Sequence, residues 1–314
     1  MTTRGKLAII SGPTAVGKTG ISLELARLAD CEIVNADSMQ VYTGMDIGTA
    51  KIREDEKEGI PHHLFDVISP KEDWNVVRFK EEAERVLDDI YLRNRLPLIT
   101  GGTAFYIQAL LYDIDFSEEE DDGVRRELEE RYRSEGIDGM YAELMKADPA
   151  SCEVIHKNNV KRVIRALEYY SLHGTPISKH NAEMHEKKSP YDFCYFVLTD
   201  DRQAIYERIN QRVDKMLEAG LLEEVKGLMA SGLDRSYVSM QGIGYKEIIA
   251  YLEGEISLEE AVYIIKRDTR HFAKRQLTWF RKEPGVIFIN RGDYATEADC
   301  ARAMYEIMKE RGLV

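Results

Sequence analysis

The sequence feature that most constrains this chain is a glycine-rich loop near its N-terminus. Gly12–Thr19 reads G-P-T-A-V-G-K-T and fits the pattern G-x-x-x-x-G-K-[ST]. It lies between a short apolar run, Lys6–Ser11, and a segment of helical period, Gly17–Ala29. In this setting the backbone N–H groups cradle anionic oxygens, Lys18 adds a positive charge and Thr19 offers a hydroxyl to Mg²⁺. The sequence therefore predicts a di- or triphosphate site, and a purely structural glycine turn is the weaker alternative.

Apolar runs and helical segments alternate through much of the rest of the chain. Further strands are predicted at Glu32–Ala36, Pro97–Thr100, Phe193–Leu198 and Val286–Asn290. Helices are predicted at Asn75–Arg93, Thr103–Tyr112 and Arg202–Met229. Such alternation indicates a parallel sheet with helices on both faces. The predicted fold class is α/β, with a P-loop NTPase-like parallel sheet as its core.

The pattern changes at Asp115. The stretch Asp115–Glu130 holds nine acidic residues and two arginines, and helical patterns without a convincing strand continue to about Leu172. Asn181–Ser189 is polar and is interpreted as a linker. We therefore predict an α/β core with C-terminal helices, made of residues 1–115 and 190–314, and an inserted helical domain of residues 116–189.

Composition excludes several classes of protein. No run of about 18 apolar residues could span a membrane, and the N-terminal apolar run is too short for a signal peptide. The four cysteines are scattered without a C-x-x-C pair, so neither a disulfide framework nor a cysteine zinc site is expected. We expect a soluble protein of the cytoplasm.

The residues at the ends of two predicted strands indicate which class of phosphate compound the loop binds. A kinase normally pairs this loop with an aspartate at the end of another strand, which helps to hold Mg²⁺. The strand Pro97–Thr100 runs instead into Gly101-Gly102-Thr103, without a carboxylate. Asp37 follows the strand Glu32–Ala36, and both strand ends should open on the side of the sheet where the loop lies. We interpret Asp37 as an acid or base acting on an acceptor group; a turn carboxylate is the alternative.

Further motifs accompany the loop. They are, in order, Asn35–Tyr42, Gly44–Lys51, Pro61–Leu64, Gly101–Thr103, Arg162, Arg165–Glu168, Gly244–Glu247 and Lys274–Gln276. In order and spacing, and over almost the whole chain, these blocks resemble the tRNA dimethylallyltransferases, also called the IPP transferase family. Ala104-Phe105 departs from the family's pattern and is interpreted as a change in packing. The chain ends at Val314 without the zinc finger of eukaryotic members, so a bacterial type is expected.

The resemblance implies a specific activity. The family transfers a dimethylallyl group from dimethylallyl diphosphate to N6 of adenosine 37 in tRNA, beside the anticodon, and releases diphosphate. The implied donor-binding residues are Gly12, Pro13, Thr14, Ala15, Val16, Gly17, Lys18 and Thr19, with Mg²⁺ near Thr19. The implied catalytic residues are Asp37, Thr103, Arg212 and Lys18. Asp37 would accept or orient the proton of N6, and the others would stabilise the leaving diphosphate. From the pattern alone, Arg208 and Arg212 fit a solvated helix face equally well.

Charge is the main objection to an RNA partner, because the formal net charge is −13. The segment Lys266–Lys282 is an exception, with seven basic residues against Asp268 alone. Ser257 and Glu260 form a capping box that predicts a helix here. At helical spacing its side chains form two stripes, a basic one of Arg267, Arg270, Lys274 and Arg281 and a core one of Ile265, Phe272 and Trp279. A solvated helix face is the alternative interpretation of the basic stripe.

The resemblance and the basic patches together imply a tRNA-binding surface. Its expected residues are Asp37, Ser38, Met39, Gln40, Thr103, Arg125, Arg126, Asn159, Lys161, Arg162, Arg165, Gln241, Gly242, Ile243, Gly244, Tyr245, Lys246, Arg270 and Lys274. Residues 37–40 would line the channel that receives the unstacked adenine. The expected partner is the anticodon stem-loop of tRNA, and the expected oligomeric state is a monomer.

Two other functions fit parts of the sequence. The loop alone favours a small-molecule or nucleoside kinase, against which the missing strand-end aspartate counts. A non-catalytic RNA-binding or GTPase-like switch protein is the other alternative, and the absence of an N/T-K-x-D base-reading motif after a strand counts against it. His62, His63 and Asp66 suggest a metal site, but adjacent strand residues point to opposite sides, so loop packing is favoured.

Overall fold

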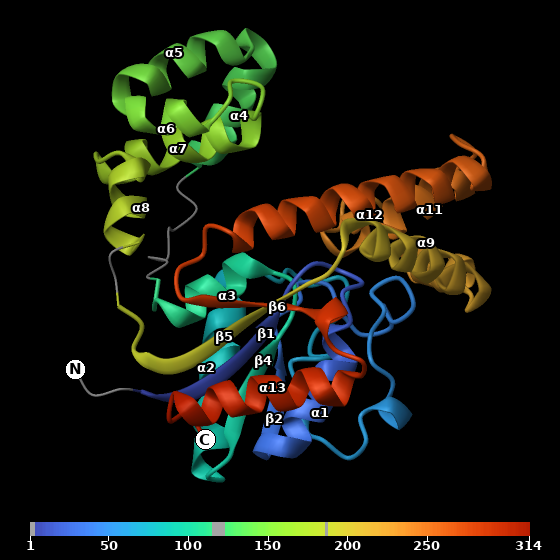
Figure 1. The fold of residues 1–314 in the computed structure, drawn as a ribbon. Helices are drawn as coiled ribbons and strands as arrows, with labels where there is room; N and C mark the ends of the chain where they lie inside the picture. Colours follow the sequence, from blue (N-terminus) through green and yellow to red (C-terminus); the bar gives the residue numbers. More distant parts are fainter. Residues whose placement is uncertain (1–3, 115–122, 186–187) are drawn as a thin grey trace. The chain divides into compact units, whose positions relative to one another are not determined.

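The fold is built on a parallel β-sheet of six strands. The computed structural model describes residues 4–114, 123–185 and 188–314. The strand order is β3-β2-β4-β1-β5-β6, and every neighbouring pair is parallel (Figure 1). The strands are β1 (Gly5–Ser11), β2 (Cys31–Asn35), β3 (His62–His63), β4 (Leu96–Thr100), β5 (Tyr191–Thr199) and β6 (Val286–Asn290). The predicted α/β class with a parallel sheet is confirmed.

Helices cover both faces of this sheet. The helices of the core are α1 (Lys18–Ala29), α2 (Val76–Leu92), α3 (Ala104–Leu111), α9 (Arg202–Glu218), α10 (Leu221–Ala230), α11 (Tyr245–Leu252), α12 (Leu258–Phe280) and α13 (Glu297–Glu310). Short 3₁₀ turns occur at η1 (Glu54–Glu56), η2 (Ser239–Gln241) and η3 (Arg291–Asp293). Burial on both faces explains why the strands are continuous apolar runs in the sequence.

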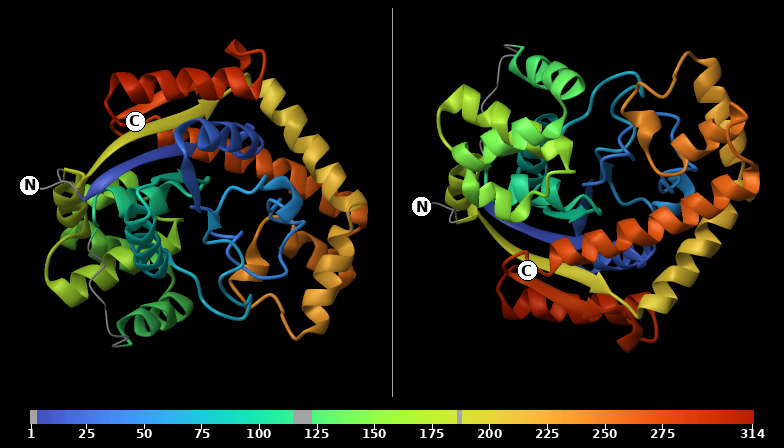
Figure 2. Two further views of the ribbon diagram at one scale, coloured as in Figure 1. Left: turned by 90° about the horizontal axis from the view of Figure 1, so that it is seen from below. Right: turned by 90° about the horizontal axis from the view of Figure 1, so that it is seen from above.

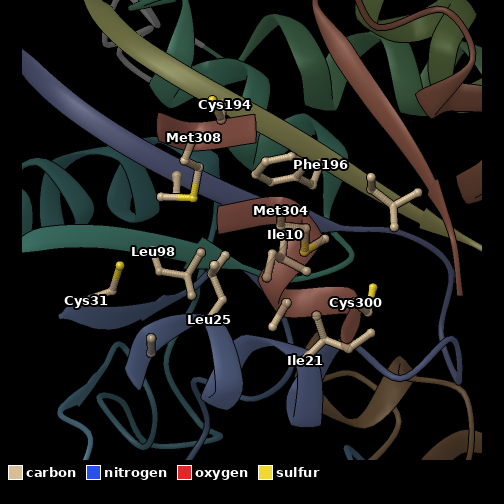
Figure 3. Close-up of a cluster of buried hydrophobic side chains, with 14 of the residues drawn as sticks. Ile10, Ile21, Leu25, Cys31, Leu98, Cys194, Phe196, Cys300, Met304 and Met308 are labelled. Atoms are coloured by element: carbon tan, nitrogen blue, oxygen red, sulfur yellow. The ribbon is translucent and has the colours of Figure 1, made fainter. Parts of the chain in front are cut away.

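Successive side chains of each strand point to opposite faces of the sheet and pack against the helices on those faces. On one face Ile10 and Phe196 join α1 and α13 in a buried cluster that includes Met304 and Met308 (Figure 3). On the other face Phe79 of α2 stacks on Tyr106 of α3, with ring centroids 4.6 Å apart. The carboxyl ends of β1, β2 and β4 therefore lie at one edge of a rigid, fully packed sheet, which is where the loop Gly12–Thr19 begins.

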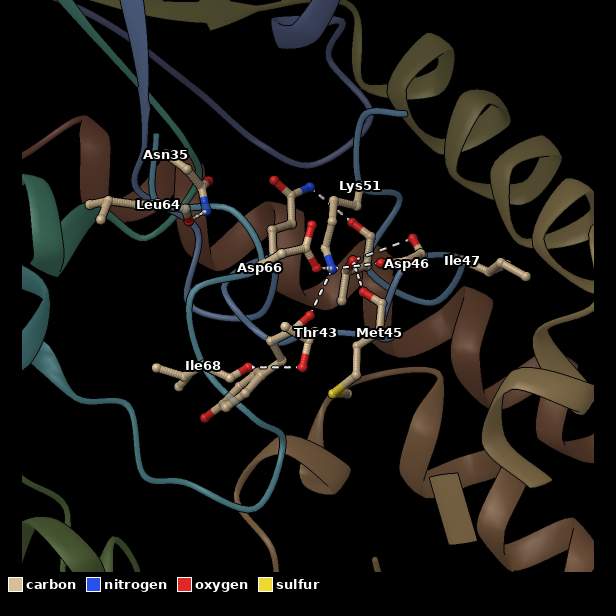
Figure 4. A network of polar contacts seen from close by, with 12 residues as sticks. Asn35, Thr43, Met45, Asp46, Ile47, Lys51, Leu64, Asp66 and Ile68 are labelled. Atoms are coloured by element: carbon tan, nitrogen blue, oxygen red, sulfur yellow. Dashed lines mark hydrogen bonds and ion pairs between the residues drawn. The ribbon is translucent and has the colours of Figure 1, made fainter. Parts of the chain in front are cut away.

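The long segment between β2 and α2 is held by polar contacts rather than by regular structure. It lies within the arc formed by α9, α10, α11 and α12 (Figure 2). Buried Lys51 bonds the carbonyl of Tyr42 at 2.7 Å and pairs with Asp46 and Asp66, each at 2.6 Å (Figure 4). Because a buried ammonium is costly unless it is paired and hydrogen-bonded, this network fixes the path of the segment.

A single carboxylate joins the same segment to the helices. Glu224 of α10 accepts hydrogen bonds from the N–H groups of Asp46, Ile47 and Gly48 at 2.9, 2.7 and 3.0 Å. It also accepts one from the Tyr245 hydroxyl at 2.7 Å. Three successive N–H groups around one anion form a nest of the kind that often binds phosphate, and here the chain's own carboxylate fills it.

Residues Tyr112–Ser189 form a second compact unit. The regular structure in its described part consists of helices. They are α4 (Val124–Glu135), α5 (Ile137–Ala147), α6 (Pro149–Val154), α7 (Val160–His173) and α8 (Ile177–His185). The first compact unit comprises Met1–Leu111 and Pro190–Val314. The interpretation of Asn181–Ser189 as a linker is wrong for its first half, because Asn181 lies within α8. Residues 115–122, half of the acidic stretch, lie outside the described residues.

None of the helices of the described chain combines the length and the apolar content that crossing a bilayer requires.

Candidate active site

The glycine-rich loop joins β1 to α1 and curls around the N-terminus of that helix. Gly12 has a φ of 140°, and a Cβ at this position would lie 2.5 Å from the carbonyl oxygen of Leu198 in β5. Only glycine therefore lets the loop turn this close to the neighbouring strand. Ala15 at the apex also has positive φ, at 62°. The loop thus makes the tight turn from strand to helix that the glycine pattern predicts, and phosphate binding there stays a prediction.

Two cations face this loop, and neither is in an ion pair with a carboxylate of the described chain. Lys18 Nζ donates to the carbonyls of Gly12 and Pro13 at 3.0 and 2.9 Å, and Arg212 of α9 lies 3.4 Å from the Thr14 hydroxyl. Burial, and then repulsion from Arg212, lowers the pKa of Lys18 to about 8. Burial likewise lowers the pKa of Arg212. Among the described residues no carboxylate lies within ion-pair distance of either cation. Asp37 partly offsets both pKa shifts from beyond ion-pair distance. Two half-buried cations without an ion-pair partner suit a polyanion.

Asp37 and Thr103 meet at the neighbouring strand ends. Asp37 follows β2, and its Oδ1 accepts the N–H of Met39 at 2.9 Å, which is an Asx turn. Thr103 follows β4, and its hydroxyl oxygen accepts the N–H of Ser38 at 3.1 Å. Oδ2 of Asp37 has no hydrogen-bond partner in the described chain. Asp37 is thus both a turn carboxylate and a carboxylate with one oxygen available to a ligand.

One cavity brings most of the sequence-derived candidates together. Its lining includes Lys18, Thr19, Asp37, Gln40 and Arg212. Phe272 and Gln276 of α12 close it from the far end of the chain. The cavity therefore has a cationic side at the loop and an acidic group at the end of β2.

The lowered pKa of Lys18 predicts a pH dependence of anion binding. Lys18 is charged below about pH 8 and becomes neutral above it, whereas a bound anion would restore the ammonium. We therefore expect the Kd for inorganic diphosphate to rise as pH increases through 8, by up to about tenfold per unit, with proton uptake on binding. Isothermal titration in buffers of different ionisation enthalpy measures both. The guanidinium of Lys18→Arg does not titrate in this pH range, so the pH dependence of its Kd should reflect only the protonation of diphosphate itself. Equal pH dependences of Kd in the wild type and in Lys18→Arg would contradict the expectation.

A second strand-end carboxylate lies beside the loop, where the sequence pattern gives no sign of it. Asp200 follows β5, which is paired with β1, so the chain does carry an aspartate beside the loop. Asp200 is almost buried and bonds Arg208 of α9 at 2.6 Å, and Arg208 Nε donates to the Ala15 carbonyl at 2.9 Å. Arg208 and Arg212 thus both face the loop, and the solvated-face alternative does not hold for them. Asp200 and Arg208 brace the loop, and the charge of Asp200 is compensated.

The residues expected to contact RNA near the cavity lie in different environments. A Cβ on Gly242 would lie 2.7 Å from the terminal methyl of Met39, so these two segments touch. The Gln40 amide donates to the carbonyls of Thr49 and Ala50, at 3.0 and 3.3 Å. Tyr245 is 1% exposed and bonds Glu224, so its side chain does not reach the surface. Exposed positions in this segment are Gln241 and Lys246.

Helix α12 begins as predicted but packs differently. Ser257 accepts the N–H of Glu260 at 3.1 Å, which confirms the N-terminal cap. The predicted core stripe is wrong for Phe272 and Trp279, which are each 37% exposed; Ala273, Gln276 and Phe280 are buried instead. The spacing along the helix places these residues on one face of α12, but part of that face, at Phe272, borders the cavity instead of the core. Phe105 is 41% exposed and meets Trp279 edge-on, so the departure at Ala104-Phe105 changes the surface more than the core.

The basic side chains of α12 divide into two groups. In the first half of the stripe Arg270 bonds Asn210 of α9 at 2.8 Å, and Arg267 bonds Asp268 at 2.8 Å. In the second half Lys274 and Arg281 are exposed and have no ion-pair partner among the described residues. The second half therefore offers the cations that are free to meet phosphate groups.

In the second unit, two of the arginines that are expected to contact RNA approach the buried carboxylate of Glu168. Arg125 and Arg165 both approach Glu168, at 3.5 and 3.1 Å. Arg126, Lys161 and Arg162 are exposed. Asn159 is the N-cap residue of α7, and its side chain makes no capping hydrogen bond.

His62, His63 and Asp66 have separate partners. His63 bonds Glu32 at 2.7 Å and His62 bonds the Ile60 carbonyl at 2.7 Å, while Asp66 pairs with Lys51. In the described ranges no three metal-ligating side chains of the His, Cys, Asp and Glu types converge. These three residues serve the packing of the segment between β2 and α2.

Comparisons with known proteins agree over most of the chain. A family described as IPP transferase matches residues 40–283, and one described as isopentenyl transferase matches residues 5–66. The tRNA dimethylallyltransferase of Lachnoclostridium phytofermentans is 54% identical over 309 residues, covering 98% of this chain and 99% of the relative. That of Acetivibrio thermocellus is 48% identical over 290 residues, covering 92% and 93%.

Solved structures show the same likeness. The full-length tRNA isopentenylpyrophosphate transferase of Bacillus halodurans is 41% identical with a TM-score of 0.74, covering 98% of both chains. A eukaryotic dimethylallyltransferase described as acting on tRNA is 30% identical with a TM-score of 0.83, covering 98% of this chain and 80% of that one.

Proposed function

Because this chain belongs to the IPP transferase family, we propose that it transfers the dimethylallyl group of dimethylallyl diphosphate to N6 of adenosine 37 in tRNA and releases diphosphate. The observation that carries the proposal is the cavity in which Lys18 and Arg212, which have no ion-pair partner in the described chain, face Asp37 across the glycine-rich loop. A cationic side would bind the leaving group, and a carboxylate side would receive the acceptor.

The donor half of the reaction depends on charge. Negative charge develops on the diphosphate as the bond between its oxygen and C1 of the prenyl group breaks, so groups that stabilise it lower the barrier. Lys18, Arg212 and the N–H groups of the loop are fixed in place before the ligand arrives, which avoids reorganisation. The hydroxyl of Thr14, which lies beside Arg212, is a further polar group of the loop.

The acceptor half depends on Asp37 and Thr103. N6 attacks C1 and then loses a proton, for which Oδ2 of Asp37 is the available acceptor. The Thr103 oxygen is occupied by the Ser38 N–H, so its own proton can be donated to the donor's diphosphate or to the base. The Asx turn of Asp37 keeps its carboxylate in one orientation.

The residues present fit Mg²⁺ as a partner of the diphosphate. Thr19 is the second residue of α1 and is exposed at the cavity. Its hydroxyl would hold the ion together with phosphate oxygens, and the ion's charge would further stabilise the leaving group. Asp200 is paired with Arg208, so its carboxylate is already engaged.

tRNA would be gripped by the exposed cations of α12 and by Arg126, Lys161 and Arg162 of the second unit. We expect Lys274→Glu with Arg281→Glu to weaken tRNA affinity about tenfold and to reduce the dependence of log Kd on log salt by about 2, because two phosphate contacts are lost. Filter binding across a salt series measures both. Lys309→Glu with Arg302→Glu is the matched control, since it makes the same charge change on α13. Equal effects of the two double variants would contradict a specific contact.

The proposed reaction is tested by one incubation with two labels. Unmodified tRNA and Mg²⁺ are mixed with the protein and either dimethylallyl-labelled donor or γ-labelled ATP. We expect the prenyl label to enter tRNA and not a transcript with guanosine at position 37. Label transferred only from ATP, or ATP consumed without RNA modification, would instead support the kinase alternative.

The setting of the protein follows from this substrate. We propose that it works in the cytoplasm as a monomer with tRNA as its only macromolecular partner. The four cysteines are free thiols, three of them buried, which suits a reducing compartment.

A further inference from the structure

The side chain of Gln276 joins two parts of the cavity that are far apart in the sequence. Its Oε1 accepts the N–H of Thr14 in the phosphate-binding loop at 2.9 Å. Its Nε2 donates to the carbonyl oxygen of Gly102, after β4, also at 2.9 Å. Gln276 is 6% exposed and lies on α12. A Cβ on Gly102 would lie 2.4 Å from Nε2, so a glycine here makes the approach possible.

The side-chain amide of Gln276 matches both partners. The Thr14 N–H needs an acceptor and the Gly102 carbonyl needs a donor, and the carboxamide carries an oxygen and an N–H group on one carbon. A carboxylate would serve Thr14 but repel the carbonyl, and a lysine or arginine would do the reverse. The chemistry of the position is therefore more restricted than its burial alone requires.

The two bonded groups belong to opposite halves of the proposed reaction. Thr14 lies on the donor side, beside Arg212. Gly102 precedes Thr103, whose hydroxyl holds the N–H of Ser38, next to Asp37. A continuous path of hydrogen bonds and short backbone links therefore runs from the diphosphate cradle through Gln276 to the carboxylate.

From this arrangement we infer that Gln276 is a positioning residue: it sets the alignment between the diphosphate cradle and the acceptor side formed by Asp37 and Thr103. The inference rests on the proposed function. Transfer requires C1 of the donor and N6 of the base to meet within about 3–3.5 Å, and a displacement of about 1 Å can cost about 10²-fold in rate. When the acceptor is misplaced, water can attack C1 instead, which yields dimethylallyl alcohol and diphosphate.

The test is the substitution Gln276→Met, which keeps the length of the side chain and removes both bonds. Single-turnover reactions with labelled donor and unmodified tRNA give the transfer rate and the ratio of dimethylallyl alcohol to modified tRNA. We expect the rate to fall about 10–100-fold and the ratio to rise at least fivefold. The Kd for tRNA and the binding stoichiometry for inorganic diphosphate should stay within twofold of the wild type. The ratio is decisive because it does not depend on the fraction of folded enzyme.

Two further variants guard this result. Gln276→Glu keeps the bond to Thr14 and loses the one to Gly102, and we expect it to raise the alcohol ratio as well. Gln203→Met is the matched control, since that glutamine is exposed on α9 and its amide bonds only Glu207 in the described residues. A wild-type ratio in both Gln276 variants would overturn the inference, as would a rate loss explained by lost diphosphate stoichiometry alone. Failure of the wild-type protein to prenylate tRNA would count against the proposed function instead.

Discussion

Replacing Asp37 with alanine is expected to lower the rate of prenyl transfer by about 10²–10⁴-fold, the range typical of a lost general base. The reason is that Oδ2 is the oxygen left available to N6, while Oδ1 serves the turn. Binding of inorganic diphosphate should persist and become slightly tighter, because a negative charge that faces the cationic loop is removed. Single-turnover transfer and diphosphate titration measure the two effects separately.

Asp37→Asn separates chemistry from folding. The amide oxygen can still accept the Met39 N–H, so the turn should survive, but the side chain can no longer take a proton. We expect Asp37→Asn to be nearly as slow as Asp37→Ala, with an unchanged melting temperature. Transfer at the wild-type rate in Asp37→Asn would remove Asp37 from the proton transfer and leave it the structural role of a turn carboxylate.

Replacing Arg212 with alanine has the second largest expected effect, a loss of about 10²–10³-fold in kcat/KM for the donor. Arg212 is a half-buried cation without a carboxylate partner in the described chain, so its charge is available to the diphosphate. We also expect the Kd for inorganic diphosphate to rise, as measured by calorimetry. Arg212→Lys should recover only part of the loss, because a point charge does not reproduce the planar guanidinium.

The same helix offers a control for Arg212. Arg202 is exposed at the first position of α9 and lies over the ring of Tyr206, at a centroid distance of 5.6 Å. Arg202→Ala should leave diphosphate binding unchanged. If Arg202→Ala and Arg212→Ala weakened donor binding equally, the effect would be one of general surface charge, and the specific role of Arg212 would be lost.

Local patterns predicted the frame of the site well. The phosphate-binding loop could be identified because strand, loop and helix follow one another within about 25 residues, and the motif needs no distant partner. Asp37 could be brought to the loop because parallel strands end at a common edge. The first inference uses the geometry of one short segment, and the second uses a general property of parallel sheets. The catalytic and binding roles assigned to these residues stay predictions.

Long-range contacts are what the sequence could not supply. Gln276 bonds a residue 262 positions away, and Arg208 one 193 positions away. Nothing in a helical period distinguishes these side chains from a solvated arginine or a core amide. The core positions predicted for Phe272 and Trp279 are wrong for a related reason, since a period gives the face of a helix but not whether a cavity or a core covers it. The linker predicted at Asn181 is wrong because a short polar helix and a linker have similar composition.

The order of the strands also has a consequence for biosynthesis. β1 pairs with β4 and β5, and its register with β5 joins Gly5 to Tyr191. A ribosome must therefore deliver nearly two thirds of the chain before the central strand gains its second neighbour, and still more before α12 arrives with Gln276. The second unit ends at Ser189, so with its local contacts it can fold before α12 is synthesised. We expect a nascent chain stopped before β5 to expose the apolar edge of β1 and to be a preferred target of chaperones.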